Sequence, residues 1–233
     1  MNSFPSGDLA VVIGASGGIG GAVARAIGCS GAFAQTVGLS RSSNPALGLH
    51  CEESIAMCAR QVAELGNPRL IVVATGVLHG DGMQPEKSWR QLEAAQMAET
   101  FAVNAIGPAL LMKHFLPLLP RDGKAVFAAL SARVGSIADN GRGGWYSYRA
   151  SKAALNQLIR TASIELKRRK PQAICIALHP GTVLTGLSAP FSKSGLDVQL
   201  PDAAAERLLR VIDALESEDS GSFLDHRGEQ VPW

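Results

Sequence analysis

A short apolar segment that runs directly into a glycine-rich turn is the feature that most constrains the fold of this chain. Residues Leu9–Ile13 read LAVVI, and the chain continues Gly-Ala-Ser-Gly-Gly-Ile-Gly. This order of buried strand, tight turn and helix start predicts the first unit of an α/β fold, with backbone N–H groups free to approach a pyrophosphate. A glycine turn that only packs a helix on a strand is the plain alternative. The turn residues that we expect to bind a dinucleotide are Gly14, Ser16, Gly18, Ile19 and Gly20.

Similar apolar runs recur along the chain and alternate with segments of helical composition. Strands with almost no polar alternation are buried on both faces, so the pattern predicts a single Rossmann-type α/β domain over residues 1–233, with a three-layer, doubly wound parallel sheet. The expected strands are Leu9–Ile13, Thr36–Leu39, Leu70–Ala74, Ala125–Leu130 and Ala173–Leu178. The expected helices are Gly18–Ile27, Glu53–Leu65, Trp89–Leu119, Tyr148–Arg168 and Asp202–Leu215. The longest expected loops are 136–144 and 185–201, and long loops in such folds are often functional.

Composition and charge narrow the class of partner. The chain has 233 residues, of which 46% are hydrophobic, and its 22 Lys and Arg nearly balance 20 Asp and Glu without an extended basic run. We therefore expect a small-molecule partner rather than nucleic acid or a membrane surface. The uninterrupted apolar runs are far shorter than the roughly 20 residues of a membrane helix. The four cysteines and five histidines show no metal-binding spacing, so we expect no metal site and a reducing, cytoplasmic location.

The end of the second expected strand bears on the choice of cofactor. A carboxylate at this point usually holds the ribose 2′-hydroxyl of NAD, but here Ser40 and Arg41 follow Leu39. A guanidinium suits a 2′-phosphate that a carboxylate would repel. Ser40 and Arg41 therefore predict NADP(H), with a solvated surface arginine as the alternative.

A tyrosine and a lysine at helical spacing are the strongest candidates for chemistry. Tyr148 and Lys152 stand four residues apart at the start of an expected helix and therefore share one face. A neighbouring ammonium favours the phenolate, so we expect Lys152 to lower the pKa of Tyr148 toward the range useful for proton transfer. The alternative is a chance pair, with a surface lysine beside a half-buried tyrosine.

Taken together, the glycine turn, Ser40–Arg41, Tyr148-x-x-x-Lys152 and Pro180–Gly181 resemble the short-chain dehydrogenase/reductase family over nearly the whole chain. Residues 143–152 and the terminal Gly-Glu-Gln-Val-Pro-Trp are most similar to its C-factor and sniffer-like carbonyl reductase branch. The resemblance implies an NADPH-dependent reductase that delivers hydride to an aldehyde or ketone, or runs the reverse oxidation, as a possible homodimer or homotetramer. An NADP(H)-binding sensor or signalling protein with incidental turnover is the retained alternative.

The resemblance also implies roles for individual residues. Tyr148 would donate the proton to the developing alkoxide, and Lys152 would lower its pKa and bind the nicotinamide ribose. Asn104 would anchor a proton relay, and Ser131 matches the serine that holds the substrate carbonyl. The further cofactor contacts implied by the resemblance are Thr75, Gly76, Asn104, Tyr148, Lys152, Pro180, Gly181, Val183 and Thr185.

The chain departs from the family pattern at two places that affect the site. The family's Asn-Asn-Ala-Gly reads Val-Ala-Thr-Gly over residues 73–76, so Thr75 is expected to replace the hydrogen bonds of the missing asparagine. The family commonly places its serine three residues before a glycine, but Ala132 holds that position before Gly135. Ser131 lies one residue early, and Ser136 therefore remains the alternative to it.

Overall fold

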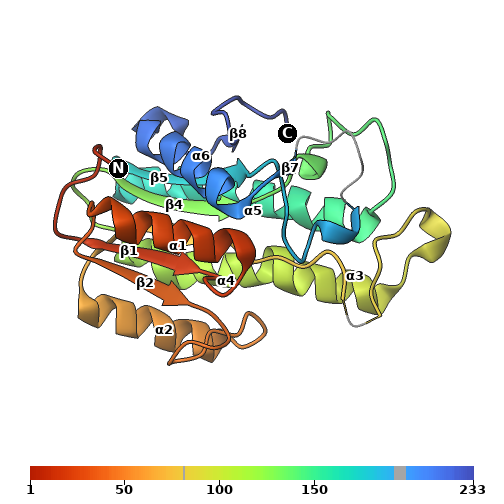
Figure 1. The fold of residues 1–233 in the computed structure, drawn as a ribbon, viewed down its shortest axis with the longest axis horizontal. Helices are drawn as coiled ribbons and strands as arrows, with labels where there is room; N and C mark the ends of the chain where they lie inside the picture. The colour runs from red at the N-terminus through yellow and green to blue at the C-terminus, as the bar shows by residue number, and fades with distance from the viewer. Residues whose placement is uncertain (81, 192–197) are drawn as a thin grey trace.

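Six parallel strands form the central sheet in the order β2-β1-β3-β4-β5-β8 (Figure 1). The computed structural model describes residues 1–80, 82–191 and 198–233. The sheet strands are β1 (Leu9–Ile13), β2 (Gln35–Leu39), β3 (Pro68–Val73), β4 (Ala125–Leu130), β5 (Ala173–His179) and β8 (Phe223–Asp225). The short strands β6 (Thr182–Val183) and β7 (Val198–Gln199) form a separate two-stranded sheet. Strand order reverses direction at β1, and open α/β sheets bind ligands at the carboxyl edge beside such a reversal.

Helices cover both faces of the sheet and produce the three layers (Figure 1). Successive residues of β1 enter opposite cores, since Val11 clusters with Ile55 of one layer and Val12 with Val23 of the other. The predicted doubly wound α/β architecture is therefore confirmed. One face carries α1 (Gly18–Ser30) and α6 (Pro201–Ala214), and the other carries α2 (Glu52–Leu65), α4 (Gly107–Phe115) and α5 (Tyr146–Arg169).

The predicted helix Trp89–Leu119 is continuous over Ala94–Leu118, but it is not a regular α-helix and Trp89–Gln91 forms a separate 3₁₀ turn. In the structure α3 (Ala94–Phe101) joins α4 through a π-helical turn over Ala102–Ile106, and short 3₁₀ turns flank the pair. An inserted residue that widens one turn hardly alters the apolar periodicity, so the sequence pattern does not reveal it. Strands β6, β7 and β8 were not predicted because two or three residues are too short to show alternation. Of the expected loop 185–201, residues 192–197 lie outside the described residues.

The helical segment Ala94–Leu118 has the length and, with a hydropathy of 1.3, the apolar character of a membrane helix. In the fold, Leu111, Met112 and Phe115 of this segment are buried in the core that α2 also covers. Packing inside the protein therefore accounts for part of the apolar character of this segment.

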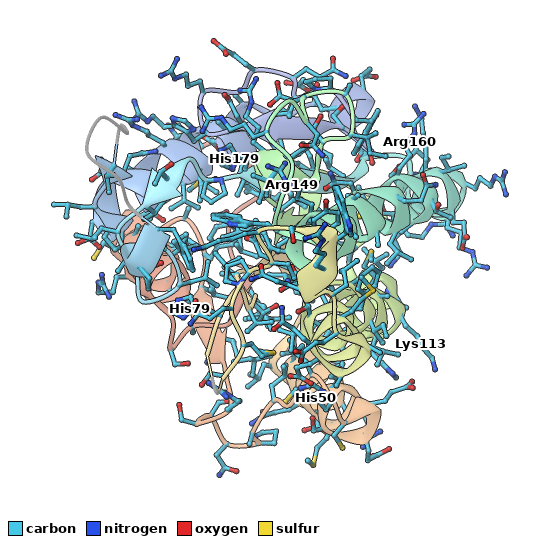
Figure 2. The ribbon with its side chains drawn as sticks, turned by 90° about the vertical axis from the view of Figure 1, so that its right-hand side faces the viewer. His50, His79, Lys113, Arg149, Arg160 and His179 are labelled. Carbon is cyan, nitrogen blue, oxygen red and sulfur yellow. The ribbon has the colours of Figure 1, made fainter. Side chains whose placement is uncertain are left out.

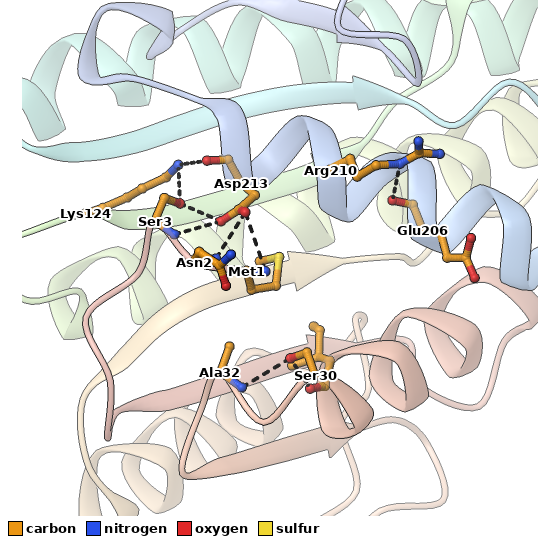
Figure 3. A network of polar contacts seen from close by, with 10 residues as sticks. Met1, Asn2, Ser3, Ser30, Ala32, Lys124, Glu206, Arg210 and Asp213 are labelled. Carbon is orange, nitrogen blue, oxygen red and sulfur yellow. Dashed lines mark hydrogen bonds and ion pairs between the residues drawn. The ribbon is translucent and has the colours of Figure 1, made fainter.

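The first residues of the chain are fastened to the end of α6 (Figure 3). The Asp213 carboxylate accepts hydrogen bonds from the backbone N–H groups of Asn2 and Ser3 at 3.1 and 3.0 Å, and from the Ser3 hydroxyl at 2.6 Å. The ammonium of Lys124 donates to the Ser3 hydroxyl and to the backbone oxygen of Asp213 at 2.9 and 2.7 Å. These contacts connect the chain terminus, α6 and the start of β4 at the edge of the sheet opposite the site described next.

Candidate active site

Tyr148 and Lys152 share one face of α5, as predicted, beside the carboxyl end of β4. Only 9% of Tyr148 and 3% of Lys152 is exposed. The Lys152 Nζ lies 5.9 Å from the centroid of the Tyr148 ring and donates a hydrogen bond to the backbone oxygen of Leu130 at 2.9 Å. This bond fixes the ammonium beside the phenol.

Burial controls the protonation of both groups. It raises the pKa of Tyr148 to about 12 and lowers the pKa of Lys152 to about 8, because a surrounding of low dielectric disfavours each charged form. The predicted lowering of the tyrosine pKa is therefore wrong for this structure, in which desolvation by burial raises it. At neutral pH Tyr148 is a protonated phenol, as a proton donor must be, and Lys152 is mostly cationic.

A cavity of about 720 Å³ opens beside Tyr148 at the carboxyl edge of the sheet. Ile19 from the glycine turn lines it, and Trp145 and Phe191 form part of its wall. Their ring centroids are 5.2 Å apart, and the Trp145 ring lies 6.2 Å from that of Tyr148. The other predicted residues that the structure places in this lining are Ser131, Pro180, Gly181, Val183 and Thr185.

Asn104 is completely buried and lies in the π-helical turn between α3 and α4. Its Oδ1 accepts from the N–H of Val77 at 2.9 Å, and its Nδ2 donates to the Val77 oxygen at 2.8 Å and to the Ser151 hydroxyl at 3.2 Å. A Cβ on Gly76 would lie 3.4 Å from Asn104 Oδ1 and 3.6 Å from Lys152 Nζ. The structure thus brings Asn104, Gly76 and Lys152 together, and π turns are frequent at functional sites.

The two candidate serines have different surroundings. Ser131 extends the β4 ladder, and its hydroxyl donates to Oδ1 of Asn156 at 2.6 Å. Ser136 donates to the backbone oxygen of Trp233 at 3.4 Å and accepts from the Asp139 N–H at 3.1 Å. Ser131 is in the cavity lining beside Tyr148, whereas Ser136 is not among the described lining residues. The geometry favours Ser131, although its hydroxyl already donates a hydrogen bond to Asn156 of α5.

The glycine turn makes the close approaches that its residue types allow. Gly14 has a φ of +90°, and a Cβ there would lie 2.9 Å from the backbone oxygen of Ala74. A Cβ on Gly20 would collide with the backbone oxygen of Gly14. The N-cap residue Gly17 makes no side-chain cap, and the first turn of α1 has no acidic residue. Ser16 is exposed in the same turn. The N-terminus of α1 therefore fits the pyrophosphate of a dinucleotide.

Thr185 brings the segment after β6 against this turn. A Cβ on Gly18 would lie 2.8 Å from Thr185 Cγ2, so glycine is needed for the contact. The Thr185 N–H donates to the Ser188 hydroxyl at 3.1 Å. Upstream, the backbone oxygen of Pro180 accepts from the Gln199 side chain at 3.2 Å, and Gly181 turns with a φ of +79°. The segment after β5 is thereby held over the glycine turn.

Ser40 and Arg41 lie beyond the cavity, at the end of β2. The N–H of Gly14 donates to the backbone oxygen of Leu39 at 2.8 Å, which places the two residues next to the glycine turn. The Ser40 hydroxyl lies 3.0 Å from that of Ser42. Arg41 is exposed and makes no hydrogen bond or ion pair within the described ranges, so its guanidinium is available to a phosphate.

Thr75 does not replace the hydrogen bonds of the missing asparagine, so that prediction is wrong. Its Oγ1 is buried and has no hydrogen-bond partner among the residues that the structure describes. The methyl group of Thr75 packs against the glycine turn, 3.2 Å from where a Cβ on Gly14 would lie. A buried hydroxyl without a protein partner beside the pyrophosphate site is consistent with a ligand that supplies the hydrogen bond.

Sequence reasoning missed several residues that organise the N-terminus of α5. Both oxygens of Glu86, which is 2% exposed, accept from the backbone N–H and hydroxyl of Ser147. Arg149 donates three hydrogen bonds to backbone oxygens of the preceding loop. Trp145 and Arg149 belong to the segment that resembles the family. Glu86 has no sequence signal, because its partner lies 61 residues away.

His179 is another residue that the sequence did not single out for chemistry. It lies with Arg149 near the middle of Figure 2, and both side chains line the cavity. Burial, followed by the charge of His226, lowers the pKa of His179 to about 4, so the ring is neutral at neutral pH. Among the described residues there is no group of three potential metal ligands.

Comparison with known proteins identifies the family. A protein-family model described as "Enoyl-(Acyl carrier protein) reductase" matches residues 49–218 of the chain. The chain is 41% identical to C-signal of Myxococcus xanthus over 143 residues, 61% of this chain and 81% of that protein. It is 31% identical to 1-hydroxy-2-glutathionyl-2-methyl-3-butene dehydrogenase of Rhodococcus sp. over 189 residues, 81% of this chain and 79% of that protein.

Among solved structures, the NADPH-bound carbonyl reductase from chicken fatty liver superposes with a TM-score of 0.84 at 25% identity, covering 100% of this chain and 97% of that chain. This likeness and the C-signal match confirm the predicted branch. Fold, motifs and relatives agree, and the chain belongs to the short-chain dehydrogenase/reductase family of oxidoreductases.

Proposed function

We propose that the protein is an NADP(H)-dependent oxidoreductase that transfers hydride to the carbonyl carbon of an aldehyde or ketone, or runs the reverse alcohol oxidation. The observation that carries the proposal is that Tyr148, Ile19 of the glycine turn and Thr185 line the same cavity. A proton donor and the two segments expected to hold the reactive end of a dinucleotide thus border one space. The NADPH bound to the chicken carbonyl reductase supports the same cofactor here.

Several features of this chain fit the cofactor. The uncapped start of α1 would bind the pyrophosphate, and Ser40 with Arg41 would bind a ribose 2′-phosphate. The buried Thr75 hydroxyl would gain a partner, and Gly76 leaves room beside Lys152 for the nicotinamide ribose. The segment from Pro180 through Gly181 and Val183 to Thr185 would border the nicotinamide. When bound, the cofactor supplies the hydride.

Tyr148 would supply the proton. Negative charge develops on the carbonyl oxygen as the carbon is reduced, and an alkoxide is a stronger base than a phenolate, even that of a phenol whose pKa is raised to about 12. The proton therefore moves from the Tyr148 oxygen to the substrate oxygen. Lys152, held on the Leu130 oxygen, would stabilise the phenolate that remains.

Asn104 and Ser131 would position the reacting groups. Asn104 holds the chain after β3 at Val77 and contacts α5 at Ser151, which keeps the two sides of the site together. Ser131 would hold the substrate oxygen by turning its hydroxyl away from Asn156. Ser136 remains the alternative, but its bonds to Trp233 and Asp139 direct it toward the C-terminus.

A sensor or signalling protein with incidental turnover is the second candidate, favoured by the 41% identity to C-signal. Sensing needs the cofactor site but not a buried Tyr–Lys pair. The discriminating experiment measures NADPH binding and NADPH oxidation by the wild-type protein with a panel of aldehydes and ketones. Turnover of panel members supports the enzyme. Tight NADPH binding with no turnover across the panel supports the sensor.

A further inference from the structure

Basic side chains gather on one side of the cavity next to Tyr148. Arg133, Arg142 and Arg149 all line it, and Asp139 is the single carboxylate among the described lining residues. With one carboxylate to oppose three guanidinium groups, this part of the wall carries net positive charge. His179, on the same wall, is neutral at neutral pH and adds none.

The three arginines are bound to the protein to different degrees. Arg133 Nε donates to Asp139 at 2.7 Å, so its charge is compensated. Arg149 donates to the backbone oxygens of Gly144, Val134 and Gly143, which fixes its position without neutralising it. Arg142 makes no hydrogen bond or ion pair with any described residue.

Arg142 and Arg149 also lie close enough to repel one another. The pKa of Arg149 is lowered, first by burial and then by the charge of Arg142. Asp139 offsets part of this repulsion, and a bound anion would offset more of it. Because Arg41 lies beyond this lining, at the end of β2, the cationic group at the cavity is separate from the expected 2′-phosphate site.

Apolar side chains also line the cavity. They are those of Leu78, Val134, Trp145, Leu187 and Phe191, and the rings of Trp145 and Phe191 meet edge to face. A ligand that matches both kinds of lining has an apolar body and a negatively charged end.

We propose that the cavity selects carbonyl compounds that carry an apolar body and an anionic group, a carboxylate or a phosphate, bound by Arg142 with Arg149 beside it. This inference rests on the proposed function, since Tyr148 in the same cavity would act on the carbonyl. The cationic side chains thus determine which carbonyl compounds are preferred rather than whether reduction occurs.

The test compares 4-acetylbenzoate with its neutral methyl ester as ketone substrates. In wild-type protein at low salt we expect kcat/KM for the acid to exceed that for the ester by about tenfold, the scale of one charge-assisted hydrogen bond. Arg142→Gln should reduce this ratio at least about threefold, and Arg142→Lys should retain most of it. High salt should also reduce the ratio. 4-Acetylphenyl phosphate distinguishes a carboxylate site from a phosphate site.

Arg121→Gln is the matched control, because Arg121 is exposed in the loop before β4 and is not in the cavity lining. Its acid-to-ester ratio should equal that of wild type. A wild-type ratio near one, or a ratio that Arg142→Gln leaves unchanged, overturns the inference while the proposed reductase stands.

If neither ketone is reduced, the proposed reductase function is not supported for these ketones. A binding measurement then tests the anion site independently of turnover. The same two ketones, which cannot be oxidised further by hydride loss, are then bound to the NADP⁺ form of the protein in equilibrium dialysis. Preferential binding of the acid that Arg142→Gln removes supports the anion site. Equal binding of acid and ester overturns it.

Discussion

Tyr148 and Lys152 are both removed from water, and their titration gives a first prediction at the scale of single residues. Burial lowers the pKa of Lys152 to about 8, so its positive charge is present at neutral pH and lost as the pH rises through that value. We expect kcat/KM for carbonyl reduction to fall as the pH rises past about 8, because the developing phenolate loses its cation. Lys152→Met should lower kcat/KM and abolish its fall near pH 8. If kcat/KM of that variant still falls at the same pH, Lys152 is not the group that titrates.

Arg41 provides a second prediction, on cofactor choice. Its exposed guanidinium has no protein partner in the described part of the chain, so Arg41→Ala should remove a contact to the 2′-phosphate without disturbing the fold. We expect NADPH binding to weaken by about 1.5–3 kcal/mol and NADH binding to stay the same. Fluorescence titration of both cofactors measures this. Arg60→Ala, in which the lost guanidinium belongs to an ion pair with Glu53 on α2, is the control.

The site could be predicted from sequence where it depends on local spacing, and not where it depends on tertiary contacts. Tyr148 and Lys152 share a face because helical periodicity requires it. The direction of the Tyr148 pKa shift depends on burial, which no spacing reveals. The partner of Ser131 is Asn156, and strand alternation alone does not predict that bond. The arginines of the cavity come together only through the fold.

At the scale of elements, α5 is held in place by a buried carboxylate at its start. Burial raises the pKa of Glu86, but hydrogen bonds from Ser147 and Gln96 outweigh it and the pKa is lowered overall. A charged carboxylate at a helix N-terminus is favoured by the helix dipole. The first turn of α5, which carries Tyr148, therefore depends on Glu86.

Glu86→Ala should destabilise the protein by about 2–3 kcal/mol, since it leaves the N–H and hydroxyl of buried Ser147 unpaired. Thermal or urea unfolding measures the change. Glu64→Ala, at an exposed position of α2, is the control and should change stability by less than about 0.5 kcal/mol. Equal effects of the two substitutions would show that Glu86 does not anchor α5.

Element boundaries were predicted unevenly, since the equally long apolar runs Leu9–Ile13 and Leu70–Ala74 gave the exact limits of β1 but not those of β3 (Pro68–Val73). Strands β1 and β4 have the predicted limits, whereas the π-helical turn around Asn104 and the three-residue β8 were missed. The π turn places Asn104 where it hydrogen-bonds to the backbone of Val77. The helical pattern of residues 89–119 does not predict this tertiary contact.

For the whole molecule, the contacts of Asp213 with the chain terminus predict a loss of stability in acid. Burial raises its pKa, but hydrogen bonds from Ser3 and Asn2 and the terminal ammonium bring it down to about 2. A carboxyl whose pKa is lower in the folded state contributes stability that is present above its unfolded pKa, near 4, and lost as the pH falls toward 2.

We expect Asp213→Asn to lose roughly 2 kcal/mol at pH 7 and much less at pH 2. Urea unfolding at both values measures the difference. Asp122→Asn is the control, because the exposed side chain of Asp122 makes no hydrogen bond or ion pair with any described residue and only its backbone oxygen accepts a bond, from Arg69. A loss of stability in Asp213→Asn that is as large at pH 2 as at pH 7 would contradict the linkage.

Assembly into a homodimer or homotetramer stays a prediction.

Proton donation by Tyr148 in carbonyl reduction can be tested with Tyr148→Phe, because this substitution removes the hydroxyl and keeps the packing of the ring. The measurement is NADPH oxidation with the aldehydes and ketones that wild-type protein reduces, together with NADPH affinity by fluorescence. We expect kcat to fall by at least about a hundredfold with little change in NADPH affinity. Reduction by Tyr148→Phe at a rate near that of wild type would contradict it.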